Sequence, residues 1–172
     1  MYKPNYKSYS RWYTLNGADF LNEDNTRTEI LSSTGKLSNT VLNNDVFLEK
    51  TVVLTATNIK AMYTTAVDVI AAPGAGKAII IDECRYFLDS SGTDYANGGV
   101  VTLAYTDKAG DACTGEIAAI SVTASADTYD MVKGVAVAPV ENAVVCVLNA
   151  TAAFITGTSP VTLQIKYRIV TL

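Results

Sequence analysis

The sequence predicts an all-β protein, an antiparallel β-sandwich that is jelly-roll-like, with about eight strands and an extended N-terminal arm. The C-terminal segment alternates strictly, with apolar residues at 161, 163, 165, 167 and 169 and polar residues between them. Such alternation is typical of an antiparallel strand with one buried and one solvated face. Several further apolar runs after residue 50 end at Gly, Pro, Asn or Asp, as strands do at turns. No amphipathic segment there is long enough for a packed helix, which argues against an α/β class.

The composition fits one folded body. Of the 172 residues, 49% are apolar and 17% are charged, so disorder along the whole chain is not expected. No apolar run reaches the length of about 18 residues that a membrane span requires, and we expect no membrane association. The N-terminal residues MYKPNYKSYSRWY lack the apolar core of a signal peptide. The cysteines, Cys84, Cys113 and Cys146, lie in apolar strand-like runs, and we expect reduced core residues rather than disulfides.

The first 13 residues form a basic aromatic segment. Lys3, Lys7 and Arg11 with no acid give it a charge of +3, whereas the other 159 residues carry 10 basic and 17 acidic side chains, a net charge of −7. Interleaved aromatic and cationic residues can pack on their own domain, dock on another protein chain or stack on single-stranded nucleic acid. Three charges bind nucleic acid weakly at physiological salt, so no nucleic-acid partner is expected. We therefore expect this segment to dock on another protein. The expected anchor residues are Tyr2, Tyr6, Tyr9, Arg11, Trp12 and Tyr13.

Residues 14–50 differ from the rest of the chain in composition. Asn, Asp, Ser, Thr and Gly are dense there, and the apolar residues come in pairs without a sustained period of 3.6 or 2. Such a segment rarely buries enough apolar surface to fold alone. The sequence therefore predicts an extended attachment arm over residues 1–50, ordered by neighbouring subunits, and a β-sandwich domain over residues 51–172.

The first elements of the domain follow from short patterns. Thr51–Ala56 is expected to form a strand, followed by one helical turn that Thr57 caps and that ends at Met62. Ala66–Ala71 is expected to form the next strand, closed by a turn at Pro73-Gly74. Lys77–Leu88 is the longest predicted strand.

The longest predicted strand leads into the second half of the domain. Its Ile79–Ile81 run is apolar on both faces, as in a strand buried between two layers. A polar loop with Gly98-Gly99 follows, and Val100–Thr106 is expected to return beside Lys77–Leu88 as one β-hairpin. The remaining expected strands lie at Glu116–Thr123, Met131–Ala138, Ala143–Leu148 and the alternating C-terminal segment.

The residues that usually carry catalysis are scarce. Histidine is absent, which removes the commonest general base and a leading metal ligand. The neighbouring acids Asp82 and Glu83 would point to opposite faces of a strand, so they cannot easily flank one glycosidic bond. The segment Gly74–Lys77 resembles a phosphate loop only in its Gly-Lys pair, because the first glycine and the Ser or Thr are missing and a strand follows.

Two oxygen-rich loops, Asp89–Asp94 and Asp107–Asp111, leave calcium binding open. Neither has the twelve-residue spacing of an EF-hand, and plain solvated turns explain them better. The cysteines lack the paired spacing of a zinc site. We expect a protein that is not an enzyme, with no cofactor and no metal site.

The domain resembles small structural virion proteins of tailed bacteriophages. The resemblance covers about residues 51–172 and rests on TVVLTATNIKAM, APGAGKAIIID, Tyr95–Gly99, Leu103–Tyr105, Asn149–Thr151 and VTLQIKYRIV. It implies a capsid decoration (cement) or head-fibre protein at the capsid surface of the virion, assembled in the host cytoplasm. The implied partners are the major capsid protein and copies of the chain itself, with a trimer suggested by analogy alone.

A second interpretation keeps the virion but places the protein in the tail or fibre, where outward loops bind a host receptor or glycan. It relies on Tyr95 and Tyr129 being exposed, because exposed aromatic rings stack on sugars. A free carbohydrate-binding module is a third class, but it would require export and a planar aromatic platform. Neither of these features is visible in the sequence.

Overall fold

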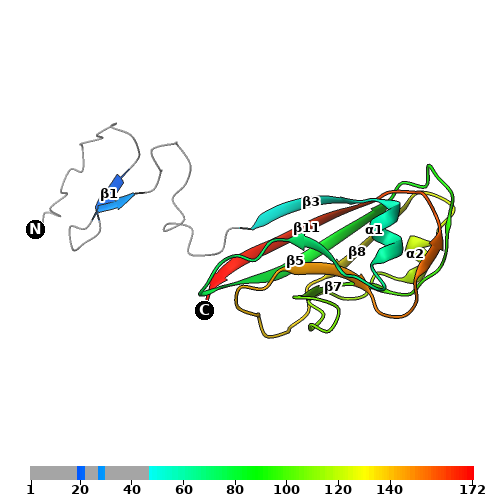
Figure 1. The fold of residues 1–172 in the computed structure, drawn as a ribbon. Helices are drawn as coiled ribbons and strands as arrows, with labels where there is room; N and C mark the ends of the chain where they lie inside the picture. The colour runs from blue at the N-terminus through cyan, green and yellow to red at the C-terminus, as the bar shows by residue number, and fades with distance from the viewer. Residues whose placement is uncertain (1–18, 22–26, 30–46) are drawn as a thin grey trace, which may run out of the picture. The chain divides into compact units, whose positions relative to one another are not determined.

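The computed structural model describes residues 19–21, 27–29 and 47–172, and the chain divides into two units between Val46 and Phe47 (Figure 1). In the first unit, β1 (Asp19–Leu21) pairs antiparallel with β2 (Arg27–Glu29). The six predicted arm anchors, at positions 2, 6, 9, 11, 12 and 13, all lie outside the described residues. Docking by the arm therefore stays a prediction.

The second unit is built almost entirely of strands. Its first half holds β3 (Leu48–Leu54), α1 (Ala56–Ala61), β4 (Val67–Ile70), β5 (Lys77–Leu88), β6 (Tyr95–Asn97) and β7 (Val101–Tyr105). Its second half holds α2 (Ala119–Val122), β8 (Thr128–Lys133), β9 (Val145–Asn149), β10 (Phe154–Thr156) and β11 (Val161–Thr171). Neither helix of the described part is long and apolar enough to cross a membrane.

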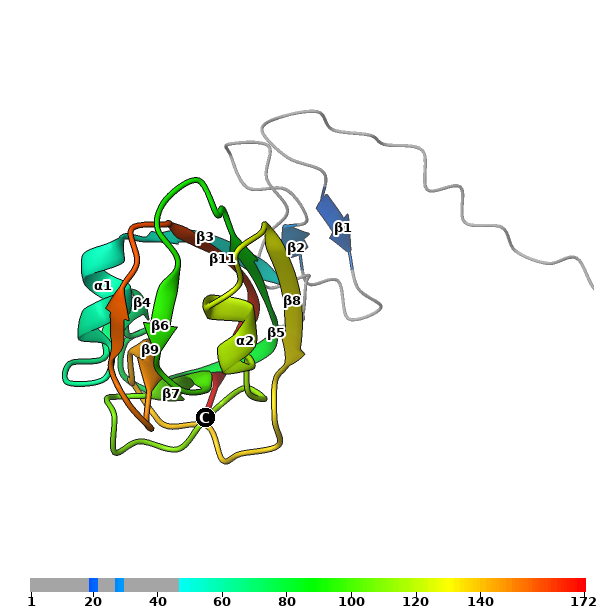
Figure 2. The same ribbon diagram turned by 90° about the vertical axis from the view of Figure 1, so that its right-hand side faces the viewer.

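The strands form two layers. One layer is a four-stranded sheet in the order β3-β11-β5-β8, and the other is a three-stranded sheet in the order β4-β9-β7. A short pair, β10-β6, completes the unit, and every pairing is antiparallel. Figure 2 looks along the unit and shows the two sheets as facing walls, with α1 beside β10 and α2 beside β8. The predicted all-β antiparallel class is confirmed, and the layers are those of a β-sandwich.

Backbone hydrogen bonds join the two sheets along one side. Cys113 N donates to the Leu103 carbonyl on β7 at 2.8 Å. The same short segment reaches the end of β8, because Gly115 N donates to the Lys133 carbonyl at 2.9 Å and Val135 N donates to the Cys113 carbonyl at 3.1 Å. This side therefore leaves no unpaired strand edge at these residues, which limits unwanted pairing there.

The predicted hairpin of Lys77–Leu88 with Val100–Thr106 is wrong. β5 pairs with β11 and β8 in one sheet, whereas β7 pairs with β9 in the other. The connection between β5 and β7 therefore crosses from one sheet to the other, and β6 within it pairs with β10. Gly98 has a φ of +86°, and a Cβ there would overlap the Phe154 ring, so this glycine makes a close approach rather than a hairpin turn.

Two shorter predictions shift as well. Thr55, not Thr57, caps α1, and it exchanges hydrogen bonds with Asn58 in a capping box. The predicted strand Glu116–Thr123 contains α2 instead, where the Ser121 hydroxyl donates to Asp130 Oδ2 at 2.9 Å. This bond joins α2 to β8 through two side chains.

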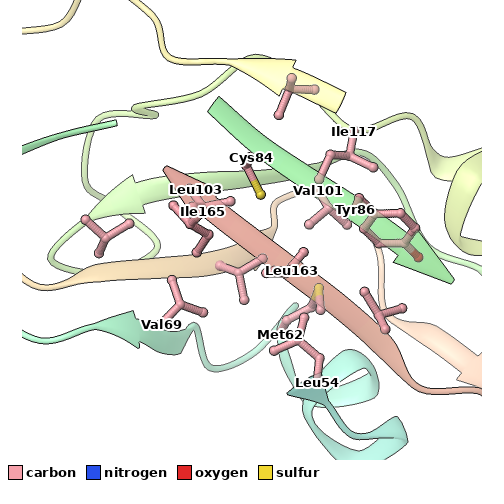
Figure 3. Packing of buried hydrophobic residues seen from close by; sticks show 14 of the residues in the cluster. Leu54, Met62, Val69, Cys84, Tyr86, Val101, Leu103, Ile117, Leu163 and Ile165 are labelled. Atoms are coloured by element: carbon pink, nitrogen blue, oxygen red, sulfur yellow. The ribbon is translucent and has the colours of Figure 1, made fainter. Parts of the chain in front are cut away.

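The core lies between the two sheets and under α1. Figure 3 shows Leu163 and Ile165 of β11, Cys84 of β5 and Leu103 of β7 pointing into this space. The alternation predicted for the C-terminal strand is confirmed, since its buried residues lie on this side. All three cysteines are free and buried, as predicted.

Candidate interaction surface

The glycine-rich turn before β5 is a structural turn. The Gly74 amide donates to Asn142 Oδ1 at 2.9 Å, and the Gly76 amide donates to Glu141 Oε1 at 2.7 Å. Both glycines have positive φ, of +99° and +70°, which only glycine adopts without strain. The amides that a phosphate would need are bound to side chains of the same chain, in line with the sequence interpretation.

The oxygen-rich loops use their carboxylates locally. Asp89 Oδ1 accepts from the Ser91 amide at 3.2 Å, and Asp107 Oδ1 accepts from the Ala109 amide at 2.8 Å. These are the turn-forming bonds that Asp makes two residues ahead of itself. Within the described ranges, no group of three or more His, Cys, Asp or Glu side chains is placed to hold a metal ion.

The most distinctive surface is the solvent side of the four-stranded sheet, which we call the outer face. Because side chains alternate along a strand, every second residue of β3, β11, β5 and β8 projects there, and the register aligns them in rows across the strands. We name the rows by content, each in the strand order β3, β11, β5 and β8. The apolar row is Val53, Thr162, Phe87 and Tyr129; the middle row is Thr51, Gln164, Arg85 and Met131; the charged row is Glu49, Lys166, Glu83 and Lys133.

The outer face exposes unusually large apolar side chains for a strand surface in water. Val53 is 59% exposed, Tyr129 61%, Met131 44% and Phe87 39%. Phe87 and Tyr129 are direct cross-strand partners, so both side chains project from neighbouring positions of this face. A contiguous exposed apolar patch of this kind typically marks a place where another molecule packs.

The charged row alternates in sign across the sheet. Glu83 is its centre, since its carboxylate accepts from Lys133 Nζ at 2.8 Å and pairs with Arg85 at 2.9 Å. The hydrogen bond from Lys133, and then the positive charges of Lys133, Arg85 and Lys166, hold the pKa of Glu83 below its ordinary value, although partial desolvation opposes them.

A bulge sets the position of this row. The register of β5 against β11 shifts at Asp82, so that Lys166 faces Glu83 while Tyr167 faces Ile81. The extra residue lets the apolar Ile79 and Ile81 keep facing the core on one side of the bulge while Cys84 and Tyr86 do so on the other. The Asp82-Glu83 pair is therefore part of a bulge.

A shallow hollow of about 90 Å³ lies on the outer face beside the charged row. Its walls come from Glu49 and Thr51 of β3, Gln164 and Lys166 of β11, and Glu83 and Arg85 of β5, with Lys50 and Ile165 also lining it. The hollow therefore extends over β3, β11 and β5, whereas the exposed Met131 lies on the remaining strand, β8.

One end of the outer face carries two cations over an aromatic ring. Lys166 Nζ lies 4.2 Å and the Arg168 guanidinium carbon 5.5 Å from the centre of the Phe47 ring. Both distances allow cation–π attraction, which fixes the orientation of these long side chains. Phe47 immediately precedes β3, so this contact ties the beginning of the sandwich to its last strand.

Charge is unevenly distributed over the sandwich. Residues 47–172 carry 8 basic and 12 acidic side chains, a net charge of −4. The outer face counters this balance with a net charge of +2, from Arg85, Lys133, Lys166 and Arg168 against Glu49 and Glu83. The rest of this unit therefore carries −6.

Of the two tyrosines predicted to be exposed, Tyr95 is buried and Tyr129 is exposed. Tyr95 is only 3% exposed, and its hydroxyl donates to the Ser159 carbonyl at 2.6 Å, so the expectation of an exposed Tyr95 is wrong. Its ring packs edge-on against Phe154, with the centroids 6.1 Å apart. Tyr129 is exposed but lies on β8 in the outer face, not on a loop.

The outer face was not predicted from the sequence as a candidate surface. The signal was present in the alternation, because Phe87 and Met131 occupy strand positions that face away from the buried neighbours Tyr86 and Val132. Finding the rows also required the strand order, which places β3 and β8 at opposite edges of one sheet.

Comparisons with known proteins give little further constraint. No protein-family model and no curated protein matches the chain. Among solved structures, a chain of the cyanophage Pam1 capsid asymmetric unit is similar over 72% of this chain and 83% of that chain, with 16% sequence identity and a TM-score of 0.43. This similarity is too low to assign a fold or a function to the chain.

Proposed function

We propose that the protein is a non-enzymatic structural component of a tailed-bacteriophage virion, a capsid decoration or head-fibre protein. In this role it binds the major capsid protein at the capsid surface and associates with copies of itself. Many copies, each contributing modest binding energy, would stabilise the shell together.

The observation that carries the proposal is the outer face of the four-stranded sheet. Four large apolar side chains are exposed on its solvent side, and such exposure favours association with another molecule. These residues are Val53, Phe87, Tyr129 and Met131. The same face holds the cationic excess of an acidic unit. These properties fit a part that is built into a larger protein assembly.

The strand order supports a jelly-roll connectivity. Eight segments can be numbered in chain order: β3, β4, β5, β7, residues 111–117, β8, β9 and β11. The fifth segment runs antiparallel beside β7 through bridges at Val101–Ile117 and Ala104–Ala112. The two layers then read 1-8-3-6 and 2-7-4-5. Eight-stranded jelly rolls recur in viral capsid and lectin domains, which supports the proposal by analogy of fold only.

The attachment arm supplies the proposed contact with the shell. Residues 1–46, the part of the predicted arm that precedes the sandwich, carry the six anchors, among them Trp12, and the first 13 residues have a charge of +3. Aromatic and arginine side chains dominate the binding energy of many protein interfaces. The arm would then bind the major capsid protein, while the sandwich remains available for self-association.

The test measures occupancy on shells of the phage that encodes the chain. Full-length protein, a variant lacking residues 1–13 and Trp12→Ala are each added to shells without the protein, and bound copies are counted by quantitative mass spectrometry. We expect the deletion to abolish binding and Trp12→Ala to weaken it about tenfold or more. Lys77→Ala, in the glycine-rich turn, is the matched control and should bind like the natural protein.

Unchanged occupancy after the deletion would remove the arm from the proposal. The copy number on natural particles separates the two placements in the virion: hundreds of copies per particle fit shell decoration. About a dozen or fewer would favour the tail or a vertex instead.

A further inference from the structure

We propose that two copies of this chain pack outer face against outer face, related by a twofold axis that runs parallel to the strands between β11 and β5. The inference rests on the proposed self-association and names its surface. It does not depend on binding to a shell, and dimerisation and shell binding are measured separately.

The outer face is the uncovered side of the sandwich. On the three-stranded sheet, the outward side chains of Ala104, Cys146 and Leu148 are buried, with Ala66 packed against them. The outward side chains of the four-stranded sheet include four large, exposed apolar residues. Within residues 47–172, the four-stranded sheet is therefore the one whose outward side is not covered by other residues of the chain.

The charged row favours a second copy as the cover. Its order across the strands is Glu49, Lys166, Glu83 and Lys133, alternately negative and positive. The proposed twofold axis reverses this order in the facing copy while keeping each row opposite itself. Glu49 then faces Lys133 of the second copy, and Lys166 faces Glu83, so every charge meets its opposite.

The other rows satisfy the same symmetry. In the apolar row, Val53 faces Tyr129 of the second copy and Thr162 faces Phe87, so apolar surface is buried against apolar surface. In the middle row, Arg85 faces Gln164, which can accept a hydrogen bond from it. No row places two like charges opposite each other.

Shape agrees with charge in the middle row. The hollow extends over β3, β11 and β5, with Thr51 in its lining, and Met131 is exposed on β8 in the same row. The twofold axis places Met131 of each copy opposite Thr51, at the β3 edge of the hollow of the other copy, giving two equivalent contacts. Methionine suits such a place because its flexible thioether fits irregular gaps.

The size of the face predicts the strength of the dimer. Four strands about 4.8 Å apart and three rows about 6.8 Å apart give a footprint of roughly 20 by 20 Å, or about 400 Å² per copy. This is less than the roughly 800 Å² per partner of a standard interface. We therefore expect a reversible dimer with a dissociation constant in the micromolar range, strengthened when copies are held together on a particle.

The test is a charge exchange across the interface. Glu49→Lys places a cation opposite Lys133 of the facing copy, and Lys133→Glu places an anion opposite Glu49, so each variant alone repels its own kind twice. An equimolar mixture of the two variants pairs a cation with an anion at both positions. Dimerisation is measured by sedimentation of the chain over about 1–100 μM. The dissociation constant of each single variant should rise about tenfold or more, and the mixture should form dimers again.

The mixture separates the interface from local damage. Lys133→Glu also removes the ion pair with Glu83, but that loss is the same in the variant alone and in the mixture. Glu116→Lys, at an exposed acid outside the outer face, is the matched control and should leave the dimer intact. Circular dichroism confirms that each variant is folded.

The proposal fails on any of three results: a natural chain that is monomeric at 100 μM, single variants that associate like the natural chain, or a mixture that stays dissociated. Shell occupancy is measured on the same variants. Variants that lose the dimer but occupy shells normally would show that dimerisation and the proposed attachment through the arm are independent.

Discussion

The two sheets differ in the side chains on the side that faces away from the core. Behind β9, the three-stranded sheet presents the small or compact side chains Ala104, Cys146 and Leu148, all buried by the chain itself. Nearby, Lys108 Nζ donates to the Tyr63 carbonyl at 2.6 Å and lies 3.9 Å from the centre of the Tyr63 ring, joining two loops. The four-stranded sheet instead presents large apolar and charged side chains to solvent.

The difference shows which apolar residues serve folding and which are available for binding. Leu148 and Cys146 gain their burial when the chain folds, so their contacts contribute to the stability of the monomer. Val53 and Tyr129 remain largely exposed after folding, so little of their transfer free energy is used. Residues of similar chemistry on the two outer faces should therefore respond differently to the same perturbation.

The largest expected difference concerns the thiol of Cys146. Burial raises its pKa to about 11, and its Sγ donates to the Ala104 carbonyl at 3.4 Å. Because only the thiolate reacts, native Cys146 should react with a thiol reagent at least about a thousandfold more slowly than in the unfolded chain. Peptide mass spectrometry after timed labelling at pH 8 measures this ratio.

Cys84 serves as the reference for full burial between the sheets. Desolvation raises its pKa to about 12, as it does for Cys113. A native Cys146 that reacted as fast as a free thiol, with Cys84 still protected, would contradict this prediction. The outward side of the three-stranded sheet would then be open to solvent, like the outer face of the four-stranded sheet.

The next effect is on the free energy of unfolding. Leu148→Ala removes a buried side chain from the covered face and should lower it by about 2–5 kcal/mol. Val53→Ala removes an exposed side chain from the outer face and should change it by less than about 0.5 kcal/mol. Urea denaturation at protein concentrations below the dimer range measures both. A cost above 1 kcal/mol for Val53→Ala would mean that its side chain already supports the monomer.

Much of the fold was predictable because the periodicity of single strands is a local property. The alternation of the C-terminal strand fixed its buried side, with Val161, Leu163 and Ile165 in the core. The pairing of strands is not local. Lys77–Leu88 and Val100–Thr106 follow each other in the chain but lie in different sheets, because β11 and β8 occupy both edges of β5.

The candidate surface was less predictable for the same reason. Each of Glu49, Lys166, Glu83 and Lys133 looks like an ordinary solvated charge when its own strand is considered alone. Their alternation in one row appears only when four strands distant in sequence are placed side by side. The bulge at Asp82 also had to be located, because it decides which acid of the Asp82-Glu83 pair enters the row.

The smallest expected effect is a pH dependence that belongs to the outer face. The pKa of Glu83 is held below its ordinary value of 4.5, first by the hydrogen bond from Lys133, so folding favours its carboxylate form. This contribution to stability is present above the ordinary value and is lost as the pH falls through the lowered pKa of the folded state. Glu83→Gln should therefore unfold slightly more easily than the natural chain at pH 7, and the two should converge toward pH 3.

The comparison uses urea midpoints measured from about pH 7 to pH 3, with Glu116→Gln as the control for the loss of any exposed carboxylate. A Glu83→Gln curve parallel to that of the natural chain would show that the ion pairs of Glu83 with Lys133 and Arg85 contribute nothing to the folded monomer. The alternating row would then have no measurable role within one chain, and pairing across the proposed dimer would be the remaining physical reason for its arrangement. Repeating the titration at dimeric concentrations tests that reason directly, because the facing Lys166 should lower the pKa of Glu83 further and widen the gap between the two curves.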